Sequence, residues 1–495
     1  MPSNLQLVLI VLCSCLWTHV SGQVVVKQMH VITRHGSRTP LGKDASNLQE
    51  NTPGSLTPFG ERQMYDLGRW IADAYNATGV FHTYSPSSVR LESSAYDRTL
   101  VSANNFALGA FSNNARDPYA ESLIPNVREN IPVYSIEPEN DIYLRAYDKC
   151  ETYHQRLEAL YTSPEWLELE QRHAPLLTRL AQLDSFRDEA DATGKIPLTN
   201  VWNVYDSIHV ATTECTLSGE GFTQTCLALE NPADRLAVNA TEFQELEVLT
   251  NVVEQMRYGP EIAGRLLGGP LLLRIIDRML RNPSGKFFLY SAHYPTILGV
   301  LSALDEQFPV EQTIPEYASA LIFILQQDMV TMKEYVRVVY KGDSQLLTPP
   351  VLMTLDFCLN EAVCPVDTFA TRWTDWSVYE WCKICNNRNA AVCLDYWLEE
   401  TEAEDFGLDK PVQTGLFIGF VLTFSLSLLV CFCCSSTRVK WDAMPPDRQE
   451  TAPTPSPSPR SNDDNGNHSF RSDSMSSVEM NDTIEEVSNK ESVMV

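Results

Sequence analysis

Short apolar runs alternate with longer amphipathic segments in two stretches of the chain, residues 23–149 and 281–400. The apolar runs have the length and composition of β-strands. They cover Val24–Ile32, Val89–Ser93, Lys286–Ser291, Leu321–Gln326 and Tyr335–Tyr340. Phe59–Tyr75 repeats apolar residues at helical spacing directly after Pro58 and predicts a helix. Strands that alternate with helices indicate an α/β layer structure.

Residues 150–280 have a different pattern. They are rich in Leu, Glu, Gln and Arg at helical spacing, as in Trp166–Gln171, and predict a mostly α-helical lobe inserted into the α/β core. The segment from the first strand to residue 400 is long for a single hydrophobic core, which favours two lobes that share one sheet.

Both ends of the chain carry apolar segments typical of targeting and membrane anchoring. Residues 1–22 contain no charged side chain and end in small residues, which predicts a signal peptide. Residues 415–434 are uncharged and mostly apolar, and they are long enough to cross a bilayer as a transmembrane helix. Arg438 and Lys440 follow this span and predict a cytoplasmic C-terminus by the positive-inside rule.

These segments predict a single-pass type I membrane protein. Its folded part is expected to be lumenal or extracellular, in an endosome or lysosome or at the plasma membrane. Residues 401–414 are a juxtamembrane linker, and the Pro-, Ser- and acid-rich cytoplasmic tail, 435–495, is expected to be disordered. Gly415 and Gly419 have the small-xxx-small spacing that lets membrane helices pair, which is compatible with a homodimer.

Acidic residues outnumber basic ones by 64 to 37, and the net charge of −27 lies mainly between the signal peptide and the span. Such a surface repels nucleic acids and anionic membrane surfaces, so neither is expected as a partner. In an acidic compartment the carboxylates protonate in part and their mutual repulsion falls. Asn76 and Asn239 begin Asn-x-Thr triplets and are the expected glycosylation sites.

The predicted lumenal segment contains an even number of cysteines, which in an oxidising compartment implies disulfides. They are Cys150, Cys215, Cys226, Cys358, Cys364, Cys382, Cys385 and Cys393. The Cys382-x-x-Cys385 spacing also occurs in zinc and redox sites, but no second pair or histidine cluster accompanies it here. We therefore expect disulfides and no metal.

One basic motif follows the first predicted strand, where His35 lies between Arg34 and Arg38. Taken alone, this motif is also compatible with a simple basic turn. Like charge lowers the pKa of a histidine, so the ring is expected to be neutral and nucleophilic. Guanidinium groups hold phosphate in forked, charge-assisted hydrogen bonds. A neutral imidazole that faces a bound phosphate can form a phosphohistidine.

The sequence Arg34-His35-Gly36-Ser37-Arg38-Thr39-Pro40 resembles the signature of the histidine acid phosphatases, a branch of the histidine phosphatase superfamily. The resemblance covers roughly residues 24–385 and continues in four further blocks: Leu56–Gly68, Tyr96–Ala103, Tyr290–His293 and Pro315–Ser319. It implies a mixed central sheet flanked by helices, with a smaller, mostly α-helical insertion lobe. The active site would lie at the carboxyl ends of the central strands.

The resemblance also implies roles for individual residues. His35 matches the catalytic nucleophile. The residues that match phosphate-binding positions are Arg34, Arg38 and His293. Asp97 and Arg98 match a block that we interpret as an ion pair supporting the site. No metal or organic cofactor is expected, because the arginines supply the positive charge.

Two positions depart from the family pattern. The family has an acidic residue after the second histidine, whereas this chain has Tyr294. Tyrosine is a much weaker acid, with a pKa of about 10 against about 4 for Asp. The family's third phosphate-binding arginine falls in the slot of Glu92, and Arg90 lies two residues earlier on the same face of the strand.

Three outcomes are open at the second of these positions. Arg90 can bind phosphate and neutralise Glu92. Alternatively, Glu92 can point inward, protonate at low pH and replace the missing acid. In the third case, the pocket has lost its affinity for phosphate dianions.

Parity and resemblance together imply four disulfides: Cys215–Cys226, Cys358–Cys364, Cys150–Cys382 and Cys385–Cys393. The leading hypothesis for function is a membrane-anchored phosphatase that hydrolyses small phosphate monoesters through a phosphohistidine at His35, with His293 in the same site. The alternative is a non-catalytic ectodomain with a binding or trafficking role, because Tyr294 stands in place of the acid.

Overall fold

The computed structural model describes residues 24–41, 54–76, 79, 81, 84–111, 131–217, 238–304, 314–359 and 361–397. All of them belong to one compact unit, residues 1–413. No helix in these ranges is long and apolar enough to cross a membrane. The predicted signal peptide, linker, transmembrane span and tail lie outside the described residues.

A mixed sheet organises the core, with strand order β3-β2-β4-β1-β5-β6-β7 and with β8 paired to β6. β1, β2, β3 and β4 run parallel to one another, whereas β5 to β8 are joined antiparallel. The strands are β1 (Val24–Arg34), β2 (Val89–Ser94), β3 (Val133–Ile136), β4 (Phe287–Ala292), β5 (Ala320–Asp328), β6 (Glu334–Lys341), β7 (Val351–Met353) and β8 (Cys364–Pro365).

The predicted mixed central sheet flanked by helices is confirmed. Each of the five strands expected from apolar runs is present, within two residues at either end. The sequence did not indicate β3, β7 and β8, which are short, and β3 and β7 form the two edges of the sheet. Edge strands are partly exposed and therefore lack the continuous apolar run that marks a buried strand.

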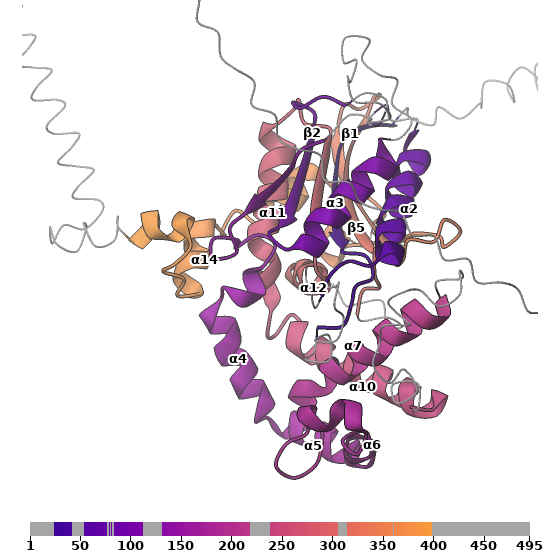
Figure 1. Cartoon of the computed structure of the whole chain (residues 1–495). Coiled ribbons are helices and arrows are strands. Elements are labelled where there is room, and N and C mark those ends of the chain that lie inside the picture. Colours follow the sequence, from indigo (N-terminus) through magenta and orange to yellow (C-terminus); the bar gives the residue numbers. More distant parts are fainter. Residues whose placement is uncertain are drawn as a thin grey trace, which may run out of the picture. The chain divides into compact units, whose positions relative to one another are not determined.

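Helices cover both faces of the sheet (Figure 1). On one face, α2 (Pro58–Ala74) and α3 (Asp97–Ala110) pack apolar side chains such as Leu67 and Phe106 against Leu289 of β4. On the other face, α11 (Gly264–Arg281) and α12 (Tyr294–Ala303) share a core with strand residues. The predicted helix after Pro58 is confirmed and is capped by the side chain of Thr57.

Most of the described residues between 150 and 258 form helices, and many of them share an apolar cluster that includes Trp166, Phe186 and Tyr205. Tyr153 and Leu157 pack instead in the core that α11 shares with the sheet. We call the helices between 150 and 258 the helical lobe. Its elements are α4 (Glu151–Tyr161), α5 (Pro164–Arg172), α6 (Ala174–Leu180), η4 (Asp184–Glu189), η5 (Leu198–Asn200), α7 (Val201–Thr212), the π-helical η6 (Thr213–Leu217) and α10 (Ala240–Tyr258). By contrast, α11 packs with the sheet, although it falls within the range 150–280.

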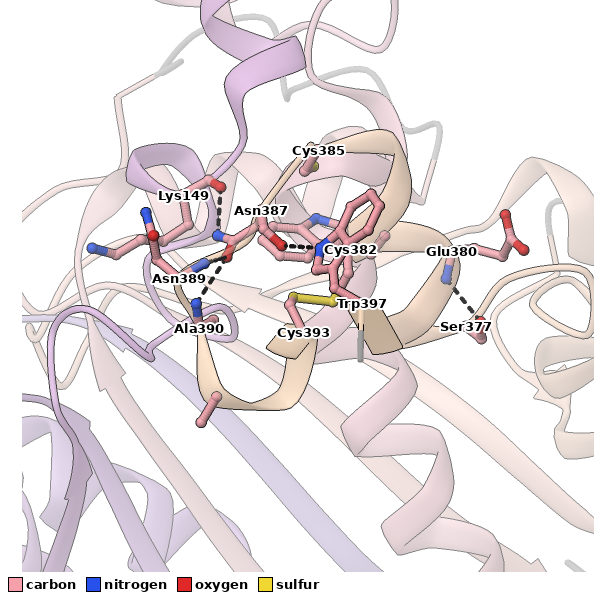
Figure 2. The surroundings of a disulfide bond; sticks show 12 residues. Lys149, Ser377, Glu380, Cys382, Cys385, Asn387, Asn389, Ala390, Cys393 and Trp397 are labelled. Atoms are coloured by element: carbon pink, nitrogen blue, oxygen red, sulfur yellow. Dashed lines mark hydrogen bonds between the residues drawn. A yellow bond between two sulfur atoms is a disulfide. The ribbon is translucent and has the colours of Figure 1, made fainter. Parts of the chain in front are cut away.

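Disulfides fasten the C-terminal helices α13 (Val366–Thr371) and α14 (Val378–Ile384) to the rest of the molecule. Cys358 and Cys364 are bonded, as predicted. Cys150, at the start of α4, pairs with Cys385, and Cys382 pairs with Cys393. Figure 2 shows the second bond.

The predicted pairs Cys150–Cys382 and Cys385–Cys393 are therefore wrong. Cys382 and Cys385 lie one helical turn apart, so their spacing along the chain does not tell which of them faces α4. In the structure, the backbone at Cys385 lies against the start of α4, where the N–H of Glu151 donates to the carbonyl oxygen of Cys385 (3.0 Å). Cys215 is disulfide-bonded, but Cys226 lies outside the described residues, so that pairing stays a prediction.

The loop of the Cys382–Cys393 bond is also held by one asparagine (Figure 2). The amide of Asn387 donates to the carbonyl oxygen of Lys149 (2.8 Å), and its side-chain oxygen accepts from the N–H of Ala390 (2.9 Å). The indole of Trp397 donates to the Asn387 carbonyl oxygen (2.8 Å). These bonds join the C-terminal segment to the entrance of the helical lobe.

Candidate active site

The strand β1 delivers the basic motif to the carboxyl edge of the sheet. The N–H of Arg34 donates to the carbonyl oxygen of Ser319 (3.1 Å), and the N–H of His35 donates to that of Ala292 (3.1 Å). The carbonyl oxygen of His35 in turn accepts from the N–H of Ala318 (3.1 Å). The backbone of His35 is therefore fixed from the two neighbouring strands.

Gly36 allows the motif to pass unusually close to the start of α2. A Cβ atom at Gly36 would lie 2.1 Å from the carbonyl oxygen of Gly60, so no other residue fits without a backbone shift. The next residue, Ser37, donates its N–H to Gln63 of α2 (2.8 Å) and its hydroxyl to Glu214 of η6. The turn after His35 is thus held by α2 and by the helical lobe together.

The ring of His35 has a defined tautomer. Its Nδ1 lies 2.8 Å from the carbonyl oxygen of Gly36. A carbonyl oxygen only accepts, so Nδ1 carries the hydrogen and Nε2 keeps its lone pair. The pKa of His35 lies well below its ordinary value, chiefly because the ring is buried and then because of Arg98 and other cationic neighbours. Burial therefore contributes more to this lowering than the flanking arginines from which the sequence predicted a neutral ring.

His293 ends at the same edge, as its position after β4 predicted. Its ring centroid lies 5.5 Å from that of His35. The Nε2 atom of His293 faces a guanidinium N–H of Arg145 at 3.3 Å and the hydroxyl of Ser94 at 2.9 Å. Arginine only donates, so Nε2 accepts and Nδ1 carries the hydrogen. Burial, followed by Arg98 and Arg145, lowers the pKa of His293 well below the usual value.

Three guanidinium groups near these rings have a donor that is not used. The Nε–H groups of Arg34, Arg38 and Arg98 are buried and find no acceptor among the residues that the structure describes. All three arginines lower the pKa of both histidines. Buried donors are almost always paired in native proteins. Three unpaired cationic donors around two neutral rings are the arrangement that receives an oxyanion.

Arg98 has a different role from the structural ion pair expected of it. It makes no ion pair with Asp97 in the described part of the chain. Burial and the neighbouring Arg38 and Arg145 instead lower the pKa of Arg98 to about 10. Arg98 therefore belongs to the cationic site itself, and its position one residue after Asp97 gave no sign of this.

Arg38 is oriented by the helical lobe. Its Nη1 and Nη2 groups donate to the two carboxylate oxygens of Asp206 on α7, at 3.0 and 2.9 Å, and both side chains are buried. This bidentate pair leaves the Nε–H of Arg38 for another acceptor. Arg34 is held differently: it donates to the carbonyl oxygen of Pro315 (2.6 Å) and lies 3.9 Å from the ring centre of Tyr317.

Arg145 is a further member of the site that sequence reasoning missed. It precedes η3 (Ala146–Asp148), pairs with Asp148 and lies 4.4 Å from the ring centre of Tyr96. No strand end or motif marked this residue, because the loop after β3 brings it to His293. Only the folded structure reveals it.

Tyr294 does not replace the missing acid. Its hydroxyl donates to the carboxylate of Glu254 (3.0 Å), which also accepts from Arg257 (2.8 Å). Burial and the charge of Glu254 raise the pKa of Tyr294 well above its ordinary value. Its proton is therefore held more tightly than that of a free tyrosine.

Arg90 and Glu92 lie outside the site, which corrects two of the expectations from the sequence. Glu92 accepts hydrogen bonds from Arg90, Arg274 and Arg278, which lower its pKa to about 2, against the effect of burial. Arg90 does neutralise Glu92, but α11 supplies two more arginines that sequence spacing did not reveal. A carboxylate with this pKa is not a proton donor even in an acidic compartment.

The register of β2 gives the physical reason. Ser94, which contacts His293, is two residues beyond Glu92 and four beyond Arg90 on the same strand. At the usual rise of a strand, these offsets amount to about 7 and about 13 Å. The ion pairs with α11 hold Glu92 at that lower level of the sheet.

This site and fold match one family of known proteins. The profile of the histidine phosphatase superfamily (branch 2) matches residues 25–341. The chain therefore belongs to the histidine phosphatase superfamily, branch 2.

Individual relatives agree. The chain is 26% identical to prostatic acid phosphatase of Rattus norvegicus over 375 residues, 73% of this chain and 89% of the relative. It is 28% identical to lysosomal acid phosphatase of Homo sapiens over 314 residues, 60% of this chain and 66% of the relative. The family and these relatives support phosphatase activity for this chain.

Solved structures show the same fold. A phytase of Citrobacter braakii aligns with a TM-score of 0.53 at 15% identity, over 70% of this chain and 97% of the phytase. A phytase of Klebsiella sp ASR1 aligns with a TM-score of 0.50 at 17% identity, over 71% and 95% of the two chains.

Substitution of Glu92 tests whether this residue stabilises the fold or acts as a general acid. Glu92→Gln should destabilise the fold by about 3 kcal/mol, because three arginines lose their counter-charge. Urea unfolding measures this, and Glu168→Gln is the matched control: its exposed ion pair with Arg172 should contribute less than about 1 kcal/mol. A Glu92→Gln variant of full stability that had lost only its activity on alkyl phosphates would show that Glu92 is an acid after all.

Proposed function

We propose that this protein is a membrane-anchored histidine acid phosphatase that hydrolyses phosphate monoesters through a phosphohistidine at His35. One observation carries the proposal. Three unpaired, buried guanidinium N–H groups surround a neutral histidine whose Nε2 lone pair is available. This combination provides both an oxyanion receptor and a nucleophile in one place.

In the first step, the Nε2 lone pair of His35 forms a bond to phosphorus, and the bond from phosphorus to the ester oxygen breaks. The electron pair leaves on that oxygen. The phosphorylated ring becomes cationic, and its Nδ1–H keeps donating to the carbonyl oxygen of Gly36, which stabilises the charge. In the second step, water attacks phosphorus, inorganic phosphate leaves, and Nε2 recovers its lone pair.

The phosphoryl oxygens would be held by the cationic groups around the two rings. Arg34, Arg38 and Arg98 offer their Nε–H groups. His293 offers its Nδ1–H, since its Nε2 already accepts from Arg145 and Ser94. These donors match the negative charge that is spread over the three equatorial phosphoryl oxygens in the transition state. The positive charge comes from the protein, and no step needs a metal or an organic cofactor.

The site offers no acidic side chain after His293 that could protonate the leaving group. The proton of Tyr294 is held by Glu254. Below a pH of about 6 the substrate is a monoanion that carries a proton of its own, because the second pKa of a phosphate ester is about 6. That proton can pass to the ester oxygen, which favours activity in acid.

Removal of the nucleophile is the direct test of the mechanism. His35→Ala should abolish turnover of para-nitrophenyl phosphate, whereas His154→Ala, which alters an exposed histidine in the helical lobe, should not. Wild type quenched during turnover should carry a protein-bound phosphate that is labile in acid and stable in alkali. Turnover by His35→Ala, with its unfolding curve unchanged, would refute the mechanism.

A second test concerns the missing acid. An aryl phosphate leaves with little protonation, so the wild type should hydrolyse aryl phosphates far faster than alkyl phosphates. Tyr294→Asp should narrow this gap by up to ~10²–10⁴, the usual contribution of a general acid. The carboxylate of Glu254 would also raise the pKa of the new Asp and keep it protonated.

Tyr294→Phe is the matched control, because it removes the hydrogen bond to Glu254 without supplying an acid, and it should leave the gap as it is. Equal rates of the wild type on aryl and alkyl phosphates would contradict the proposal that the site lacks a general acid.

The positions of Tyr294 and Asp206 also favour a second candidate, a non-catalytic ectodomain that binds a phosphate group. The site has no acidic residue after His293 that could protonate the leaving group. In addition, the Nη1 and Nη2 groups of Arg38 already donate to Asp206. If neither the wild type nor Tyr294→Asp hydrolyses either ester class, while inorganic phosphate still binds, this second candidate replaces the first.

Membrane anchoring is part of the proposal and is supported by the apolar segments 1–22 and 415–434 and by the basic residues after the second of them. This topology predicts glycans on Asn76 and Asn239 in the folded part and none on the triplets at Asn467 and Asn481. Glycosidase treatment of the single variants Asn76→Gln and Asn239→Gln measures the number of glycans. A glycan at Asn467 or Asn481 would show that the orientation in the membrane is opposite to the predicted one.

A further inference from the structure

A second cationic cavity lies on the side of the sheet that α11 covers, between β2, β3 and that helix. Its volume is about 320 Å³, and its lining includes Arg90, Arg274 and Arg278 together with Glu92 and Asp141. None of these residues contacts His35 or His293 in the interactions described above. The cavity borders the candidate active site through Ser93 and Leu144, which precede Ser94 and Arg145.

Positive charge exceeds negative charge in this cavity. Glu92 stays ionised, since its pKa is about 2, and it balances one of the three arginines. Asp141 is buried, and burial raises its pKa against the effect of its backbone hydrogen bonds and of Arg145 and Arg274. Even with both carboxylates ionised, three arginines face two negative charges. The Oδ1 atom of Asp141 accepts the N–H groups of Tyr143 and Leu144. Its Oδ2 is buried and has no partner in the described part of the chain.

Two of these arginines also have guanidinium N–H groups that make no hydrogen bond among the described residues. Among the described residues, Arg90 and Arg274 each make one hydrogen bond, to Glu92, out of the five N–H groups that a guanidinium carries. Aromatic rings also contact both guanidinium groups, since Arg90 lies 4.0 Å from the ring centre of Tyr134 and Arg274 lies 3.4 Å from that of Tyr143. Preorganised guanidinium planes bind oxyanions with little loss of side-chain entropy.

We propose that this cavity is a second oxyanion site, which binds one phosphate-sized group through Arg90 and Arg274, beside the Glu92–Arg278 pair. The bound group is either free inorganic phosphate or a second phosphate on a substrate whose first phosphate lies at His35. Both share the same recognition chemistry.

Phosphate binding to the full-length protein in detergent tests the proposal without any need for turnover. Equilibrium dialysis against radiolabelled inorganic phosphate should give two equivalents per chain for the wild type. The double variant Arg90→Gln/Arg274→Gln should bind one equivalent fewer, or bind the second at least tenfold more weakly. Arg281→Gln removes one positive charge, as each single substitution does, but at an exposed position of α11, and it should bind like the wild type.

An unchanged stoichiometry and affinity in the double variant would overturn the proposal. Thermal unfolding in phosphate-free buffer checks that the variants fold. If the double variant does not, the single variant Arg90→Gln, which changes a half-exposed side chain, should still weaken the second equivalent. The decisive quantity is the difference between wild type and variant, so the proposal survives even if the wild type proves to have no phosphatase activity.

Steady-state kinetics separate the two sources of the group. If the site takes a second phosphate of the substrate, the KM of an alkyl bisphosphate should rise at least tenfold in the double variant, while that of the matching monophosphate stays constant. If free phosphate is the ligand, both KM values should stay constant while the second equivalent in dialysis is lost.

Discussion

Concentrated positive charge at the carboxyl end of β1 is the constraint on which the site depends. Arg34, Arg38, Arg98 and Arg145 converge on two imidazole rings that burial keeps neutral. Buried cations are poorly screened from one another, and burial together with the charges of Arg38 and Arg145 lowers the pKa of Arg98. In the phosphatase that we propose, an oxyanion bound here would relieve this repulsion and pair the free N–H groups. The unfavourable electrostatics of the free site would then contribute to the free energy of binding.

Carboxylates from the helical lobe partly balance this positive charge and also orient the side chains of the site. Asp206 fixes the guanidinium plane of Arg38. Glu214 accepts the hydroxyls of Ser37 and Thr57, so it joins the turn after His35 to the cap of α2. Glu214 lies in a π-helical turn directly after α7, and such turns often mark functional positions. The lobe therefore holds both Arg38 and the turn after His35 in position.

The amino-acid sequence predicted the parts of the molecule that depend on local patterns. Buried strands are visible as apolar runs, and residues that follow parallel strands meet at one edge of the sheet, a rule that correctly placed His293 beside the motif. Tertiary packing decides the rest. Arg145 and Asp206 belong to a loop and a helix that carry no motif. The role of Glu92 stayed open because its partners on α11 lie more than 180 residues away in the sequence.

The bond between Cys150 and Cys385 spans 235 residues of sequence and encloses the helical lobe and most of the sheet in one covalent ring. A ring of this kind changes what a protease can do to the protein. A single cut in any surface loop between the two cysteines opens the ring but releases no fragment, since both pieces stay joined through the disulfide. The nicked molecule separates into two chains only after the bond is reduced. A compartment rich in proteases can therefore process this protein without dismantling it.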